Sequence, residues 1–260
     1  MKKLLILCVL AGSALWAQEE GPFGATFTVH GGLHFLSFNK EILKGLAFAG
    51  IYSDTLPETY KKEKKYGFGN SLTSVGFDAF AYFSDHHKIG IFYAQGFSKA
   101  KRRIKNWPVI TDTGTIYSQA NSIAEISMRT YGFELGYSSW VTESIELGVA
   151  CGIGKASSVF RRLLLLYLPT WEQINEGTEK PPFFMSEISS NFFLIRLVLS
   201  VKYKFVKWLI VGLQTGGWFG RTKFGNWYIH GMQNIPDSPN VSFNGFFFNL
   251  SLTLDNRSLR

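Results

Sequence analysis

The feature that most constrains this chain is an alternation of apolar with small or polar residues, repeated in several segments with a period of two. Between residues 145 and 154 every odd position is apolar and every even position is Glu, Gly or Ala. This period is that of a β-strand whose two faces meet different surroundings. After residue 17 the chain has no run of about 18 apolar residues, the length that a membrane-spanning helix requires. An all-β fold is therefore expected.

Eight segments carry this alternation, and most are close to the roughly 9–11 residues of a tilted transmembrane strand. They are residues 27–35, 75–83, 89–93, 131–137, 145–154, 193–205, 209–219 and 246–254. Short turns are predicted at 84–88, 138–144 and 206–208, and long loops at 39–65, 99–122, 155–187 and 220–242. Short turns on one rim and long loops on the other are typical of a transmembrane barrel with periplasmic turns and extracellular loops. The sequence thus predicts an eight-stranded antiparallel up-and-down transmembrane β-barrel, with both chain ends on the periplasmic side.

The alternation does not by itself tell which face lies outside. A periplasmic lipocalin-like barrel, also eight-stranded, would turn its apolar face inward and its charged face to water. Two features favour the membrane: the face opposite the apolar one is mostly Gly, Ala, Ser and Thr, and the loops alternate in length. Aromatic residues make up 16% of the chain and there are 26 glycines, which suits aromatic girdles at a lipid interface and a curved barrel wall.

The N-terminus has the layout of a secretory signal peptide over residues 1–17. Lys2 and Lys3 precede an apolar stretch at residues 4–10, and small residues follow. Cleavage is expected after Ala14 or Ala17, and residues 18–260 are expected to form a single barrel domain in the bacterial outer membrane. An uncleaved membrane anchor is the alternative. The formal net charge is +8, which can indicate a nucleic-acid partner, but export argues against one.

This layout of strands, turns and loops resembles the small eight-stranded outer-membrane barrels of the OmpX, OmpW and OmpA-barrel type. The resemblance covers nearly the whole chain after the signal peptide, and it implies a barrel surrounded by outer-membrane lipid and inserted by the barrel assembly machinery. Members of that class often end on an aromatic residue, whereas here a polar tail, residues 255–260, follows Leu254. Similarity to the OmpW type implies a narrow channel or binding site for small hydrophobic molecules.

With the apolar face outward, several ionisable side chains face the barrel interior. They are His30, His34, Asp78, Glu134, Glu146, Arg196, Lys202 and Lys204. An eight-stranded barrel encloses a space that side chains just fill, so opposite charges there are expected to pair and close the lumen. A proton or ion path through the same residues is the alternative.

His30 and His34 share one face of the first strand, and Asp78 is expected at a similar height on the second. A His–Asp pair could activate a hydroxyl, as in a lipid-modifying acyl transferase or hydrolase, but no Ser or Thr is singled out as a nucleophile. The two histidines lack a third metal ligand. We therefore assign no catalytic residue, metal or cofactor, and expect the protein not to be an enzyme.

The predicted loops contain two further groups of residues. The third long loop is unusually apolar, with Leu163, Leu164, Leu165, Leu166, Tyr167, Leu168, Phe183 and Phe184. These residues could extend the strands, lie on lipid headgroups, contact one another, or line the mouth of a site for a small apolar ligand. The basic patches could meet an anionic surface, although a solvated charge run is the default; they are Lys61, Lys62, Lys64, Lys65, Lys99, Lys101, Arg102 and Arg103. The expected role is structural or surface-interactive, with passage or binding of small apolar molecules second.

Overall fold

The fold is known from a computed structural model. It describes residues 24–37, 71–111, 114–165, 183–229, 233–235, 238 and 240–256. The predicted signal peptide at residues 1–17 and the first predicted long loop, with Lys61, Lys62, Lys64 and Lys65, lie outside these ranges. Among the described residues no helix has the length and apolar character needed to span a membrane.

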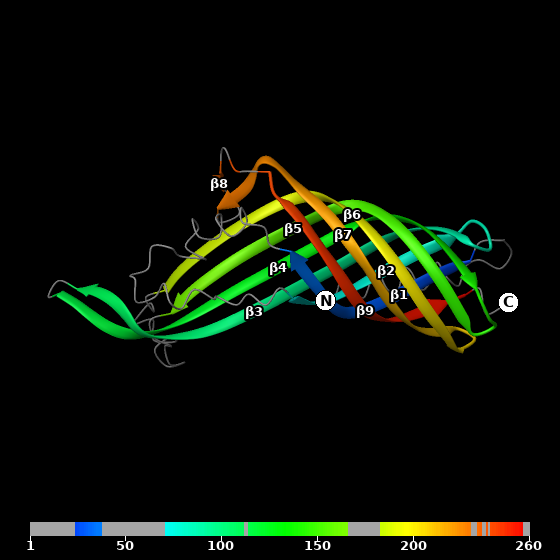
Figure 1. Ribbon diagram of the computed structural model, residues 1–260, viewed down its shortest axis with the longest axis horizontal. Coiled ribbons are helices and arrows are strands. Elements are labelled where there is room, and N and C mark those ends of the chain that lie inside the picture. The colour runs from blue at the N-terminus through cyan, green and yellow to red at the C-terminus, as the bar shows by residue number, and fades with distance from the viewer. Residues whose placement is uncertain are drawn as a thin grey trace, which may run out of the picture.

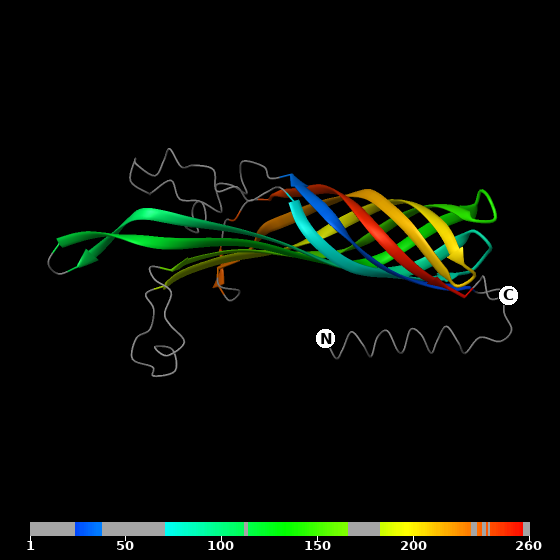
Figure 2. The same ribbon diagram turned by 90° about the horizontal axis from the view of Figure 1, so that it is seen from below.

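Eight long antiparallel strands close into a barrel (Figures 1 and 2). The strands are β1 (Ala25–Ser37), β2 (Ser71–Tyr82), β3 (His87–Thr111), β4 (Gly114–Trp140), β5 (Ile145–Leu165), β6 (Phe183–Val206), β7 (Leu209–Ile229) and β9 (Ser242–Asp255). Each of these strands pairs with its neighbour in sequence, and β1 pairs with β9 to close the cylinder. The two-residue strand β8 (Gln233–Asn234) pairs only with the end of β7. The predicted eight-stranded up-and-down barrel is confirmed.

The three short connections and both barrel-closing strand ends lie at the same end of the barrel. The amide of Phe83 donates to the carbonyl of His87 at 3.1 Å, and that of Val141 donates to the carbonyl of Ile145 at 2.8 Å. The amide of Asn256, just after β9, donates to the carbonyl of Ala25 at 3.3 Å. The start of β1 and the end of β9 are therefore joined at the rim that carries the turns.

The prediction of loops at 99–122, 155–187 and 220–242 is wrong over most of the residues that the structure describes. β3 and β4 continue as a paired hairpin to Thr111 and Gly114, with an irregularity between Ile104 and Trp107. β5 and β6 remain paired as far as Leu165 and Phe183, and β7 continues to Ile229. The alternation of apolar and polar residues marks only the part of each strand whose outer face meets an apolar medium. Backbone hydrogen bonding continues past that point, because each amide still needs a partner.

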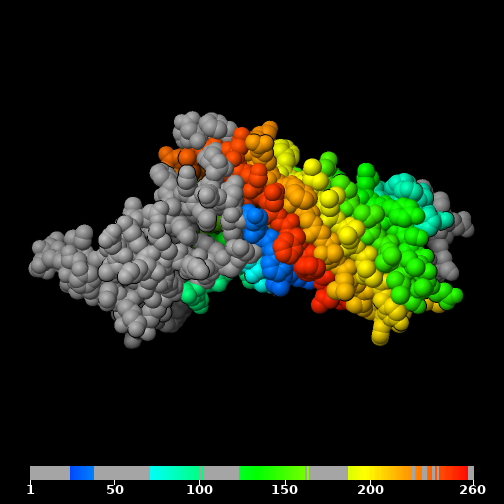
Figure 3. All heavy atoms as spheres, viewed as in Figure 1, coloured from blue at the N-terminus to red at the C-terminus, as the bar shows by residue number. Residues whose placement is uncertain are grey.

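The outer surface of the barrel is apolar over the predicted strand ranges. Phe133, Phe205 and Leu250 are each 68% exposed, and the other apolar residues of this face are also open to the outside. Figure 3 shows strand side chains covering the wall continuously from β1 through β9 and β7 to β6. A lipocalin-like barrel would bury this face, so the soluble alternative is contradicted. An apolar surface of this extent is what a bilayer covers.

Candidate functional site: the polar network that crosses the lumen

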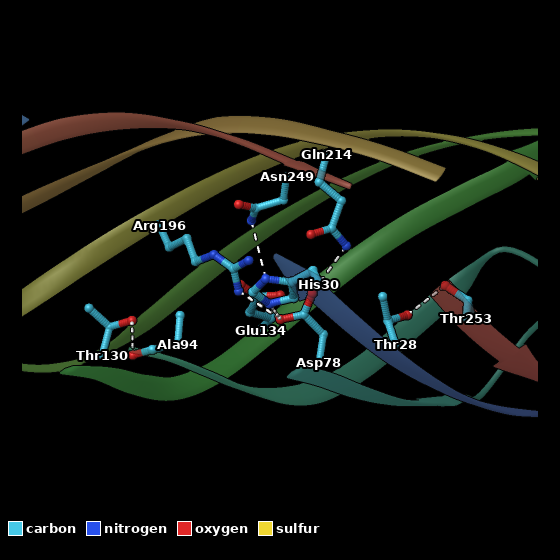
Figure 4. A network of polar contacts seen from close by, with 10 residues as sticks. All are labelled: Thr28, His30, Asp78, Ala94, Thr130, Glu134, Arg196, Gln214, Asn249 and Thr253. Carbon is cyan, nitrogen blue, oxygen red and sulfur yellow. Dashed lines mark hydrogen bonds and ion pairs between the residues drawn. The ribbon is translucent and has the colours of Figure 1, made fainter. Parts of the chain in front are cut away.

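The most distinctive group of side chains lies in the middle of the barrel, around Arg196 of β6 (Figure 4). Its Nη1 donates to Asp78 Oδ1 of β2 at 2.9 Å and to Glu134 Oε1 of β4 at 2.7 Å. All three side chains are at most 5% exposed. One guanidinium therefore joins two carboxylates that come from two different strands, β2 and β4.

Gln214 and His30 complete the shell around Asp78, and Asn249 contacts His30. Gln214 of β7 donates from Nε2 to Asp78 Oδ2 at 3.2 Å. His30 of β1 places Nε2 at 3.5 Å from Asp78 Oδ1, and the amide nitrogen of Asn249 of β9 lies 3.2 Å from His30 Nδ1. Both ring nitrogens of His30 lie next to polar side chains of the network. The network thus takes side chains from β1, β2, β4, β6, β7 and β9.

Aromatic rings and glycines fit the network into the lumen. The guanidinium of Arg196 lies over the ring of Phe92 at 4.9 Å and over that of Phe247 at 5.2 Å. A Cβ at Gly152 would come within 2.6 Å of Glu134 Cγ, and one at Gly76 would come within 2.5 Å of His30 Cε1. These two glycines leave the room that the charged side chains occupy, so the small residues of the inward face are part of the arrangement.

A second polar level lies nearer the short turns. Glu146 is 1% exposed and accepts from the hydroxyl of Tyr82 at 3.4 Å, and that hydroxyl is also 3.2 Å from Ser138 Oγ. Lys202 is buried and stands directly across from Glu146 in the β5–β6 register. Lys204 is half-buried at the rim, with Nζ 4.3 Å from the ring centre of Trp140.

On the loop side the lumen is filled by aromatic rings. Phe192 and Phe243 stack with centroids 4.5 Å apart, and Trp227 and Phe160 lie within 6.0 Å and 6.4 Å of Phe243. All four are at most 4% exposed. Polar and aromatic levels therefore succeed one another along the barrel axis, as expected for a barrel whose interior is filled by side chains.

The predicted interior residues all lie on the inward face. The structure brings His30, Asp78, Glu134 and Arg196 together and places Glu146 and Lys202 on a separate level. His34 is 5% exposed and its ring lies 5.3 Å from that of Phe247.

Three further inward side chains, Gln214, Asn249 and Lys88, were not among the predicted interior residues. Lys88 is 3% exposed, with Nζ 4.5 Å from the ring centre of Phe80. Lys88 lies in the predicted turn at 84–88, although its even position beside the alternating segment 89–93 is that of an inward residue.

The His–Asp pair does not have the surroundings of a nucleophilic site. Both ring nitrogens of His30 face Asn249 and Asp78, so neither is directed at a hydroxyl. In the described part of the chain, no three His, Cys, Asp or Glu side chains gather in a way that could hold a metal ion. The arrangement is that of a buried ion-pair network.

The basic and apolar residues predicted in loops lie on strand extensions where they are described. Lys99 contacts Glu125 at 2.5 Å across the β3–β4 pair. Lys101, Arg102 and Arg103 follow it on β3. Leu163, Leu164 and Leu165 pair in register with Met185, Phe184 and Phe183, so they extend the strands, whereas Leu166, Tyr167 and Leu168 lie outside the described residues.

The sequence matches no protein-family profile and no curated protein sequence. Solved structures that it resembles include Neisserial surface protein A, at 8% identity and a TM-score of 0.42 over 90% of this chain and 97% of that one. They also include the attachment invasion locus protein Ail of Yersinia pestis, at 7% identity and a TM-score of 0.34 over 90% of this chain and 100% of that one. A third is the outer membrane protease OmpT of Escherichia coli, at 11% identity and a TM-score of 0.38 over 90% of this chain and 96% of that one. These likenesses are too distant to bear on function.

The strand pairing and the two faces of the barrel define the class of protein. A closed eight-stranded antiparallel barrel, apolar outside and polar inside, is the architecture of the small outer-membrane β-barrels.

Proposed function

We propose that this protein is an integral protein of the bacterial outer membrane that works as a non-conducting scaffold and holds long β-hairpins outside the cell for contact with other surfaces. The observation that carries the proposal is the network around Arg196. It joins side chains of six strands across the lumen, next to a level of stacked aromatic rings. A lumen occupied in this way offers no continuous aqueous path, unlike the wider barrels of porins.

The reach of the β3–β4 hairpin supports the surface role. Beyond Lys99 the two strands stay paired to Thr111 and Gly114, which is about 40 Å at roughly 3.3 Å per residue. Figures 1 and 2 show this hairpin extending well past the other strands, at the end opposite the short turns. A projecting paired hairpin offers backbone and side chains to a partner at a distance from the lipid.

Surface labelling of intact cells tests the orientation. An epitope inserted between Thr111 and Gly114 is expected to bind antibody on intact cells. The matched control is the same epitope inserted in the β6–β7 turn between Lys207 and Trp208, which should be labelled only after the outer membrane is permeabilised. Labelling of the turn but not the hairpin on intact cells would refute the proposal.

Conductance separates the scaffold from the channel alternative. In a planar bilayer the purified protein should give no unitary current steps, whereas regular steps would show that the lumen conducts. Native mass spectrometry after gentle extraction tests the second alternative, binding of small hydrophobic molecules. A stoichiometric adduct of a small apolar molecule other than a membrane phospholipid would replace the scaffold role with ligand binding.

A further inference from the structure

The outer wall of the barrel carries a groove on its β4–β7 side. The groove has a volume of about 640 Å³ and runs across outward-facing residues of all four strands. Its floor and sides are apolar, with Phe133, Ile153, Ile195 and Phe219 each at least 50% exposed. Two basic residues, Lys155 and Arg221, also line it. The groove is therefore apolar over most of its length and cationic where those two residues lie.

A smaller and more polar hollow adjoins this groove. It has a volume of about 360 Å³ and shares Tyr131, Lys155 and Phe193 with the groove. Asn191 and Lys223 line its other side. An apolar groove and a polar, basic hollow thus meet at one place on the wall.

Phe193 lines both the groove and the hollow, and three basic side chains lie around it. Lys155 of β5 and Arg221 of β7 are its register partners on either side. The Nζ atoms of Lys155 and Lys223 lie 5.8 Å and 5.7 Å from the centre of its ring. These basic side chains converge although they repel one another, which favours a site that receives an anion.

Carboxylates of the same outward face are engaged elsewhere. Glu125 contacts Lys99 at 2.5 Å, and Glu187 accepts from Arg161 at 2.7 Å. None of the described residues that line the groove or the hollow is acidic. The positive charge around Phe193 is thus not offset by a carboxylate in the site.

Along the barrel axis, this site lies where the edge of the apolar core of a bilayer is expected. On β6 the outward positions from Phe193 to Tyr203 are apolar or aromatic, whereas Asn191 and Ser189 beyond them are polar. Ten residues of strand span about 33 Å, which at a tilt of about 40° is close to the roughly 25 Å apolar band of outer-membrane barrels. The three cations lie at the loop-side end of that band, where lipid headgroups are found.

We propose that the groove and the hollow together bind one phosphate-bearing anionic lipid of the outer leaflet, with an acyl chain in the groove and the phosphate among Lys155, Arg221 and Lys223. This inference rests on the proposed outer-membrane location. A lipid satisfies both halves of the site, because its acyl chain covers the apolar groove and its phosphate neutralises the cations. A soluble anion would leave the groove empty.

Native mass spectrometry of the protein in nanodiscs of equal parts phosphatidylglycerol and phosphatidylcholine tests this site. Wild-type protein should retain phosphatidylglycerol over phosphatidylcholine by about tenfold or more after the bulk lipid is stripped, because each surface cation favours anionic lipid. The triple variant Lys155→Gln, Arg221→Gln, Lys223→Gln should lose most of this preference. A control variant, Lys101→Gln with Lys207→Gln, removes two exposed cations elsewhere and should keep it.

A charge-conserving variant, Lys155→Arg with Arg221→Lys and Lys223→Arg, guards against misfolding and should also keep the preference. Equal retention of both lipids by the wild type, or an unchanged preference in the triple variant, would overturn the lipid site while leaving the membrane location intact. Failure of the wild type to enter nanodiscs at all would instead refute the proposed function, together with the inference that depends on it.

Discussion

Replacing Arg196 by Met removes the guanidinium that joins Asp78 and Glu134 and leaves both carboxylates in the lumen without it. The two ion pairs are 2.9 Å and 2.7 Å long, and all three side chains are buried. Removing one member of a buried ion pair typically costs about 3–5 kcal/mol, because the partner is left desolvated and uncompensated. Because Met keeps much of the contact with Phe92 and Phe247, the loss of stability is expected to come mainly from removal of the charge. With a urea m-value of about 2 kcal/mol/M, a loss of 4 kcal/mol lowers the unfolding midpoint by about 2 M.

The assay is reversible urea unfolding of the protein in lipid vesicles, followed by tryptophan fluorescence. The matched variant carries Arg196→Met with Asp78→Asn and Glu134→Gln, which removes the carboxylates together with the cation. It should recover most of the lost stability, because buried ion pairs replaced as a whole cost little. A midpoint for Arg196→Met within about 0.5 M of the wild type, or a combined variant less stable than the single one, would refute the account of the network.

Two further pairs of substitutions test the inner and outer faces of the wall by the same unfolding assay. Gly32→Ala should destabilise the protein by about 1–3 kcal/mol, because the added Cβ would collide with the carbonyl oxygen of Phe248. Gly31→Ala should stay within about 0.5 kcal/mol of the wild type, because its Cβ would meet its nearest neighbour at 3.5 Å. Equal effects of the two substitutions would show that the inward face is not tightly filled there. Leu250→Arg, in the middle of the apolar face, should cost about 2–4 kcal/mol in vesicles and Asn244→Arg, near the loop rim of the same strand face, about 0–1 kcal/mol. Equal costs for those two would mean that the face does not meet lipid.

The strands could be predicted from the sequence because lipid on one side and a filled lumen on the other impose the period of two. The segment 145–154 shows the pattern without interruption, and it lies within β5. The same reasoning ended β3 near Lys99, since from Lys99 to Asn106 charged or polar residues occur on both faces and the regular alternation is lost. The pairing of β3 with β4 nevertheless continues to Thr111. It could not be predicted because the residue pattern of one strand does not show which strand it pairs with.

The charged members of the network could also be predicted, because an ionisable residue on the inward face is conspicuous. Gln214 and Asn249 could not be, since neutral polar residues are common on that face and their role depends on meeting Asp78 and His30 across the closed barrel. These contacts join residues 136 and 219 positions apart in the sequence. The lipid groove was missed for a similar reason, because its cations come from separate strands and converge only in the folded wall.

Cys151 provides a site at which to test whether the apolar wall faces lipid. It is exposed on the outward face of β5, among the apolar residues of the segment 145–154. A nitroxide attached there, in a Cys8→Ser background and in lipid vesicles, can be measured by electron paramagnetic resonance with two relaxation agents. If the wall faces lipid, the nitroxide will collide often with oxygen, which concentrates in the bilayer, and rarely with a water-soluble nickel chelate. Frequent collisions with the chelate and few with oxygen would place the wall in water and contradict the account.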